Sequence, residues 1–193
     1  PYPVNSYNSS MTPKERWEKR NWFLFLTGYF AIGYVLINWF NESRSHYFDV
    51  AFPFEGAVPF ISFFILGYPF VYVSMLVLYF SIDDIDLWRR GVVAYLVLTT
   101  LCYIVYLLFP VKMVDRPEVG GMIVRTVFDK IARFYFIVDR PFNALPSIHA
   151  AYPTLATILV WRTARRGRWL LLAMTVTISV SVVLVKQHYI LDV

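Results

Sequence analysis

The sequence predicts an all-α integral membrane protein, a bundle of membrane-spanning helices with one further amphipathic helix at the membrane surface. Of its 193 residues, 58% are hydrophobic and only 16% are charged, and the mean hydropathy is +0.53. A soluble domain carries roughly 25% charged residues. The charged residues are also gathered between long apolar stretches, which is typical of a membrane protein.

Five apolar stretches are candidate spans, because a helix needs about 20 apolar residues to cross a bilayer. They cover residues 21–40, 59–80, 91–109, 147–161 and 169–185. The polar stretch before the first span is too long and mixed for a cleavable signal peptide. We therefore expect a cytoplasmic segment over 1–20 and a single membrane-embedded domain over 21–193.

Two other stretches have a different character. Residues 48–60, FDVAFPFEGAVPF, contain too many turn-forming residues to span, and predict an interfacial or re-entrant loop. Within residues 117–140, apolar side chains recur at Val124, Val127, Phe128, Ile131 and Phe134. That spacing, with basic residues off the apolar stripe, predicts an amphipathic helix lying on the membrane.

Loop charges predict the orientation. Five crossings place the N-terminus, the 81–90 loop and the 162–168 loop on one side. That side carries Lys14, Arg16, Lys19, Arg20, Arg89, Arg90, Arg162, Arg165, Arg166 and Arg168. Basic loops mark the cytoplasmic side, so the net charge of +5 is interpreted as membrane-surface charge and no nucleic-acid partner is expected. The long outer loop is basic too, which requires another explanation.

Ionisable residues gather on the outer side in three stretches. FPVKMVDRPEV contains Lys112 and Arg116, DRPFNALPSIHAAYP contains Ser147 and His149, and KQHYILDV contains Lys186. Each has an ordinary explanation alone, such as a helix cap for Ser147 or a snorkelling side chain for Lys186. Ionisable groups near membrane depth are costly, however, and are functional candidates by default. Their common side favours one shared site.

These residue types suggest phosphoryl transfer. Lys112, Arg116 and Lys186 would supply positive charge for phosphate oxygens. Ser147 and the amides at the helix start that follows would donate hydrogen bonds to an anion.

A histidine pair would carry the chemistry. His188 and Asp192 are spaced i, i+4 and would share one face if this stretch is helical. A carboxylate bonded to one ring nitrogen raises the basicity of the other, which suits a nucleophilic histidine. His149 would then be the general acid that protonates the departing alkoxide.

Three alternatives stay open at this stage. His149, His188 and Asp192 could bind zinc, although the nearby lysine and arginines would repel a cation. A serine hydrolase through Ser147 lacks the Gly-x-Ser-x-Gly elbow. A non-enzymatic anion or lipid transporter would use the same cations only for binding. The single cysteine, Cys102, excludes an intramolecular disulfide.

The motifs resemble those of the type 2 phosphatidic acid phosphatase superfamily of membrane lipid phosphate phosphatases. That family's pattern is Lys-x6-Arg-Pro, then Pro-Ser-Gly-His, then Ser-Arg-x5-His-x3-Asp. The matching stretches here are KMVDRP, PSIH and SVVLVKQHYILD, in the same order. Three departures occur: Lys112 precedes Arg116 by four positions instead of seven, Ile148 replaces the glycine, and Val182 replaces the arginine.

With these departures, NALPSIHAAYP and KQHYILDV are similar to the branch of inositol phosphorylceramide (aureobasidin-target) and sphingomyelin synthases. Those relatives transfer a phospho-headgroup between lipids. By position, the resemblance makes His188 the nucleophile that becomes phosphohistidine, Asp192 its partner and His149 the acid. Phosphate binding is implied for Lys112, Arg116 and Ser147, with Lys186 in place of the charge lost at Val182.

The resemblance thus implies a membrane enzyme, a lipid phosphatase or headgroup phosphotransferase, acting on a lipid phosphate or phospholipid at the outer or lumenal face. No metal or other cofactor is expected. The oligomeric state is left open. The family has a sixth spanning helix around and after the third motif, so we also expect the chain as given to be truncated.

Overall fold

The computed structural model describes residues 11–163 and 167–193, and this part of the chain is built from helices. Its six α-helices are α1 Pro13–Glu42, α2 Phe70–Ser81, α3 Ile85–Leu108, α4 Val127–Val138, α5 Ile148–Thr163 and α6 Arg168–Leu184. Three short 3₁₀ turns are η1 Glu55–Ala57, η2 Ser62–Gly67 and η3 Ile190–Asp192. Between described residues, the only strand-like pairing is one bridge from Phe48 to Val111. The all-α prediction is confirmed.

Three helical stretches of the described chain are long and apolar enough to cross a membrane: Pro13–Glu42, Ser62–Ser81 and Ile85–Leu108. The remaining two predicted spans form α5 and α6, of 16 and 17 residues. At 1.5 Å per residue these helices reach about 24–26 Å, less than the ~30 Å hydrocarbon core. Three spans are therefore supported, and the count of five stays a prediction.

Helix α1 begins earlier than the first predicted span. The Thr12 hydroxyl accepts from the Glu15 amide at 3.3 Å, and the Glu15 carboxylate accepts from the Thr12 amide at 2.8 Å. This capping box, with Pro13 in the first turn, favours a helix start at this point. The later half of the predicted segment 1–20 is thus helical, and its first ten residues lie outside the described part.

Helix α4 is shorter than the amphipathic helix predicted over 117–140, and that prediction was wrong for the residues before Val127. A second capping box, formed by Thr126 and Asp129, sets the helix start. Val124 therefore lies in a loop. Within α4, Ala132 and Phe136 are buried, whereas Val127 and Phe134 of the predicted apolar stripe are exposed. That this helix lies on the membrane surface stays a prediction.

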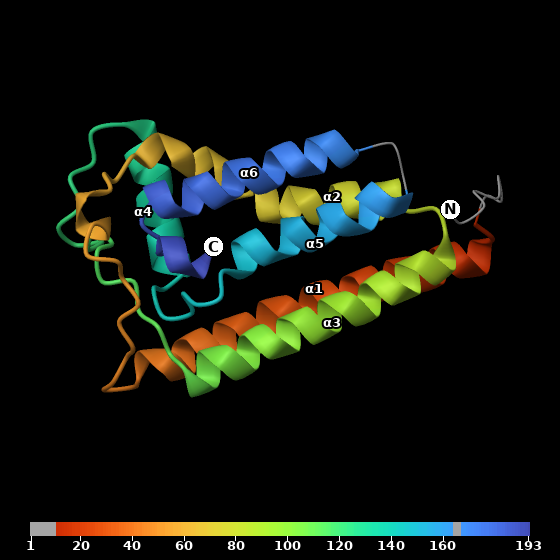
Figure 1. The fold of residues 1–193 in the computed structure, drawn as a ribbon, viewed down its shortest axis with the longest axis horizontal. Helices are drawn as coiled ribbons and strands as arrows, with labels where there is room; N and C mark the ends of the chain where they lie inside the picture. Colours follow the sequence, from red (N-terminus) through yellow and green to blue (C-terminus); the bar gives the residue numbers. More distant parts are fainter. Residues whose placement is uncertain (1–10, 164–166) are drawn as a thin grey trace.

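The helices form two groups, shown in Figure 1. α1 and α3 lie side by side as one pair, and α2, α5 and α6 pack together as the other group. α4 packs on η2 and runs across one end of the bundle. The long loops and the last residues of the chain gather at that end (Figure 1).

The opposite end of the bundle holds the start of α1, the turn between α2 and α3, and the facing ends of α5 and α6 (Figure 1). The charges of the loops predicted that these connections lie on the same side of the membrane. Arg165 and Arg166, which contributed to that assignment, lie outside the described residues, as does the side chain of Arg162. Which end faces the cytoplasm stays a prediction.

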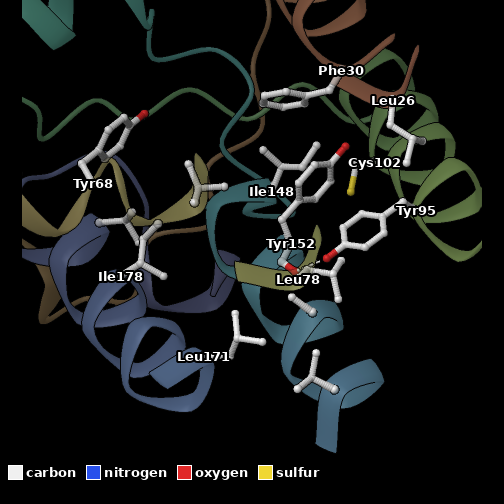
Figure 2. Packing of buried hydrophobic residues seen from close by; sticks show 14 of the residues in the cluster. Leu26, Phe30, Tyr68, Leu78, Tyr95, Cys102, Ile148, Tyr152, Leu171 and Ile178 are labelled. Carbon is white, nitrogen blue, oxygen red and sulfur yellow. Dashed lines mark hydrogen bonds between the residues drawn. The ribbon is translucent and has the colours of Figure 1, made fainter. Parts of the chain in front are cut away.

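An aromatic core joins the two groups of helices. The Tyr95 hydroxyl of α3 donates to the Tyr152 carbonyl of α5 at 2.9 Å, and the Thr99 and Tyr152 hydroxyls are also hydrogen-bonded. Figure 2 shows Tyr95 and Tyr152 packed beside Phe30 of α1 and Ile148 of α5. α5 is thereby held centrally, and its first turn carries His149.

Candidate active site

Two histidines that are distant in the sequence meet at the loop-rich end of the bundle. His149 lies in the first turn of α5, and His188 lies in the stretch after α6. His149 Nδ1 is 3.2 Å from His188 Nε2. Both side chains are buried, with 2% and 3% of their surface exposed. The structure therefore brings together the two histidines that the motifs singled out.

The contacts of His188 determine which of its ring nitrogens carries the proton in the neutral form. Nδ1 lies 2.8 Å from the Ala144 carbonyl oxygen, which can only accept, so Nδ1 must donate. Asp192 Oδ2 lies 3.5 Å from the same nitrogen. Neutral His188 therefore has its free lone pair on Nε2, and the Nδ1–H of His149 points toward it.

Asp192 reaches His188 through a turn, and the prediction of a shared α-helical face was wrong. α6 ends at Leu184, and Lys186 adopts a left-handed φ of 55°, which breaks the helix. A 3₁₀ turn then carries Asp192 back, with its Oδ2 accepting from the Tyr189 amide at 2.8 Å. Its carbonyl accepts from the Ser147 amide at 2.8 Å, which joins the second and third motifs.

Asp139, at the C-terminal end of α4, faces the other side of the histidine pair. Its Oδ2 lies 3.8 Å from His149 Nε2. The Tyr34 hydroxyl donates to its Oδ1 at 2.8 Å, and the Tyr68 hydroxyl donates to its Oδ2. The carboxylates of Asp139 and Asp192 thus flank the pair of rings, one beside each histidine.

Amide side chains attach the loop after α4 to helix α1. Asn41 donates to the Asn143 side-chain oxygen at 3.1 Å, and Asn143 donates to the Tyr34 carbonyl at 3.2 Å. Asn38 donates to the Arg140 carbonyl at 3.1 Å. Because these bonds are made in a buried environment, they hold the loop firmly. They fix Ala144, whose carbonyl binds His188.

A cavity lined by three basic and two acidic side chains, called here the basic cavity, lies between the loops that follow α3 and α4. Its volume is about 360 Å³, and it is lined by Glu42, Lys112, Met113, Val114, Arg116, Pro117, Glu118, Val119, Phe136, Ile137, Arg140, Pro141 and Phe142. A crevice of about 10 Å³ shares Arg140 and Pro141 with it and reaches His188. The basic cavity and the crevice that His188 lines are therefore neighbours.

Comparison with known families places the chain in a superfamily. A family model described as the PAP2 superfamily matches residues 57–193, more than half of the chain. The chain belongs to the PAP2 superfamily. PAP2 membership supports a phosphatase or phosphotransferase that acts on lipid phosphates. The closer resemblance to inositol phosphorylceramide synthases stays a prediction. Searches of curated proteins and of solved structures found no match.

Arg116, from the stretch KMVDRP, connects the three stretches that the sequence analysis singled out. Its guanidinium donates to the Asp139 carbonyl and to the Gln187 side-chain oxygen, both at 2.7 Å, and to the Phe136 carbonyl. It also lies over the Phe136 ring, 4.2 Å from the centroid. Burial lowers the pKa of Arg116, but an arginine stays charged at any physiological pH. Arg116 thus lines the basic cavity as a fixed cation.

The other predicted phosphate-binding residues are placed differently. Lys112 lines the basic cavity, with its ammonium 5.3 Å from the Phe142 ring centroid. Ser147 is buried directly before α5, and its hydroxyl accepts from the Ala150 amide at 3.4 Å. Lys186 lines neither the basic cavity nor the crevice, and its ammonium donates to the Glu55 carbonyl at 2.8 Å.

The zinc alternative finds no ligand set in the described chain. Among the residues that the structure describes, no group of three or more His, Cys, Asp or Glu side chains could hold a metal ion. The ring nitrogens of His188 instead contact His149 and Ala144.

Sequence reasoning missed Asp139, Tyr34 and Gln187. Asp139 directly precedes Arg140 in the stretch DRPFNALPSIH, so the rule that ionisable residues near membrane depth are functional candidates would have selected it. Nothing in the sequence marks Tyr34, because it is one of 14 tyrosines and precedes the region matched by the PAP2 family. Its contact with Asp139 depends on how α1 packs against the rest of the bundle.

Proposed function

We propose that this PAP2 protein transfers the phosphoryl group of a lipid phosphate ester through a phosphohistidine formed at His188. One observation carries the proposal: the Nε2 lone pair of His188 faces His149, beside a crevice that adjoins the basic cavity. A nucleophile, an acid and fixed cations are the parts that phosphoryl transfer needs.

The first step is an in-line displacement at phosphorus. His188 Nε2 attacks, forming a nitrogen–phosphorus bond, while the bond from phosphorus to the lipid alkoxide breaks. His149, once it has taken up a second proton, gives its Nδ1 proton to the departing oxygen and becomes neutral. Asp139 faces His149 Nε2 and stabilises the charged ring before the proton is transferred. Asp192 and the Ala144 carbonyl hold the proton on His188 Nδ1.

The second step reverses these roles. The hydroxyl of water or of an alcohol gives its proton to His149, and its oxygen attacks phosphorus as the nitrogen–phosphorus bond breaks. Water as acceptor gives a phosphatase, and a lipid or polyol hydroxyl gives a phosphotransferase. A phosphodiester substrate would transfer its headgroup phosphate by the same chemistry, as expected for a branch that resembles inositol phosphorylceramide or sphingomyelin synthases.

The histidines must separate when the substrate binds. An in-line displacement places the attacking nitrogen and the departing oxygen on opposite sides of phosphorus. A separation of 3.2 Å between the two ring nitrogens leaves no room for a phosphoryl group. In this proposal the two rings therefore move apart when the substrate binds.

The cations of the basic cavity would bind the phosphate oxygens. We assign this role to Arg116 and Lys112, with Ser147 at the N-terminal end of α5. For Lys186, the bond to the Glu55 carbonyl favours an anchoring role over phosphate binding. The chemistry requires no metal ion. The site would face the periplasm, the cell exterior or an organelle lumen, with the start of α1 in the cytoplasm.

The test is turnover by the full chain in detergent–lipid micelles with EDTA. Phosphatidic acid, and separately a phosphodiester lipid with an acceptor alcohol, are supplied, and free phosphate and new lipid species are measured. His188→Ala should abolish both activities, whereas the exposed His46→Ala should not. With phosphate-labelled substrate, acid-labile label should be trapped on wild type only. Equal behaviour of wild type and His188→Ala would refute the proposal and favour a transporter.

A further inference from the structure

A second cavity, called here the apolar cavity, lies between α1 and α2. Its volume is about 180 Å³, and it is lined by Phe23, Leu26, Thr27, Phe30, Val71, Tyr72, Met75, Leu76 and Tyr152. None of these residues is charged. Leu76 and Tyr72 are exposed, 46% and 51%, so the cavity opens sideways at α2, between two candidate spans. At that depth the medium outside is hydrocarbon.

The walls of the apolar cavity lead to the histidine pair. On α1, Phe30 is followed one helical turn later by Tyr34, and on α5, Tyr152 is preceded by His149. Figure 2 shows Phe30 lying against Tyr152, with their ring centroids 5.2 Å apart. One turn corresponds to ~5 Å. The near end of the cavity therefore lies only about one turn deeper than His149.

Tyr34 belongs to both regions. Its ring packs on Phe30, with centroids 5.6 Å apart. Its hydroxyl donates to Asp139, and it lines the crevice that reaches His188. Tyr68, which precedes α2, also lies between the two regions. Its ring centroid is 4.4 Å from that of His149, and Val71, three residues later, is the first residue of α2 that lines the cavity. The apolar cavity and the site are thus neighbours, with a layer of packed aromatic rings between them.

We propose that the apolar cavity holds one hydrocarbon chain of the lipid whose phosphate binds at His188. This inference rests on the proposed function and assigns the place where a hydrocarbon chain of its lipid substrate binds. Phe23 and Phe30 are seven residues apart, so the cavity extends for about 10 Å along α1. A chain attached to a phosphate at the histidines would run along α1 toward the centre of the membrane.

A matched pair of variants on α2 tests this. Leu76→Trp places a large ring in the cavity, and Val73→Trp makes the same change three residues away at a position that is similarly exposed but does not line it. For dipalmitoyl phosphatidic acid, Leu76→Trp should raise KM by at least about tenfold. For para-nitrophenyl phosphate, which has no chain, both variants should match wild type. Equal effects of the two variants on both substrates would overturn the inference while leaving the proposed function intact.

A second measurement does not depend on turnover. A phosphatidic acid with a diazirine in the middle of one acyl chain is photolysed with the full chain in micelles, and labelled peptides are quantified. The label should concentrate on α1 and α2 residues of the apolar cavity, and Leu76→Trp should reduce it where Val73→Trp does not. Label spread evenly over all lipid-facing helices would overturn the inference. Loss of turnover with cavity labelling intact would count against the proposed function alone.

Discussion

Two glycines of α1 offer a controlled test of how tightly the helix pairs are packed. A Cβ added at Gly33 would lie 2.4 Å from Cε2 of Tyr103 on α3, whereas one added at Gly28 meets nothing within 4 Å. Small residues allow membrane helices to approach closely. Gly33→Ala and Gly28→Ala are therefore the same chemical change in one helix. At position 33 the new methyl group meets a neighbouring ring, and at position 28 it meets no neighbouring atom.

The expected magnitudes follow from the contacts of Tyr103. Its hydroxyl donates to the Phe30 carbonyl at 2.6 Å, and its ring packs on Tyr29, so it cannot move freely. Alanine improves helix propensity by about 1 kcal/mol. At Gly33, overpacking costs about 1–3 kcal/mol, and losing the hydrogen bond about 0.5–1.5 kcal/mol. Gly33→Ala should thus destabilise by about 1–3 kcal/mol, and Gly28→Ala should stabilise by about 0.5–1 kcal/mol.

The assay is reversible unfolding in mixed micelles with increasing SDS, which reports the free energy of unfolding of each variant. Tyr103→Leu removes the atoms that the new methyl group meets. In that background Gly33→Ala should no longer destabilise the protein. Comparing the two single variants with the double variant isolates the interaction between positions 33 and 103. Equal free energies of unfolding for Gly33→Ala and Gly28→Ala would contradict the close packing of α1 on α3. So would a Gly33→Ala that destabilises the Tyr103→Leu variant as much as wild type.

Three further predictions concern the site and its supports. Asp139→Asn keeps an acceptor for one of the two tyrosine hydroxyls and removes the charge that faces His149, so kcat should fall at least about tenfold and the pH optimum should move. The exposed control Asp86→Asn should leave both unchanged. In Arg116→Lys, a single ammonium cannot replace the guanidinium that donates to three oxygen atoms, so the free energy of unfolding should fall by about 1–3 kcal/mol. An unchanged midpoint of unfolding in SDS would contradict this. Hydrogen bonds from the Ser62 side chain and from Thr126 hold the pKa of Asp129 at about 2, below its ordinary value of 3.8. A carboxylate whose pKa is lowered in the folded state stabilises the fold at every pH above its ordinary pKa, and this stabilisation is lost as the pH falls toward 2. The difference in Tm between wild type and Asp129→Asn should therefore be constant at neutral pH and shrink between about pH 4 and pH 2.

The sequence by itself was sufficient for the class of fold and for a first set of candidate site residues. A run of about 20 apolar residues has few stable alternatives to a membrane helix, since lipid leaves backbone groups without other partners. The motifs KMVDRP, PSIH and KQHYILD pointed to His149, His188 and Asp192 because such polar groups are costly in an apolar chain. The starts of α1 and α4 were predicted at other residues, because the capping boxes at Thr12 and Thr126 were not used.

Only the tertiary structure decided how these residues meet. Spacing predicted a helical face for His188 and Asp192, but the chain turns at Lys186, and Asp192 returns through a 3₁₀ turn held by the Ser147 amide. The approach of Asp139 to His149, the contact of Tyr34 with Asp139 and the apolar cavity all arise where separate helices pack together. Local sequence patterns carry no information on such long-range contacts, because each depends on the relative placement of elements that are far apart in the chain.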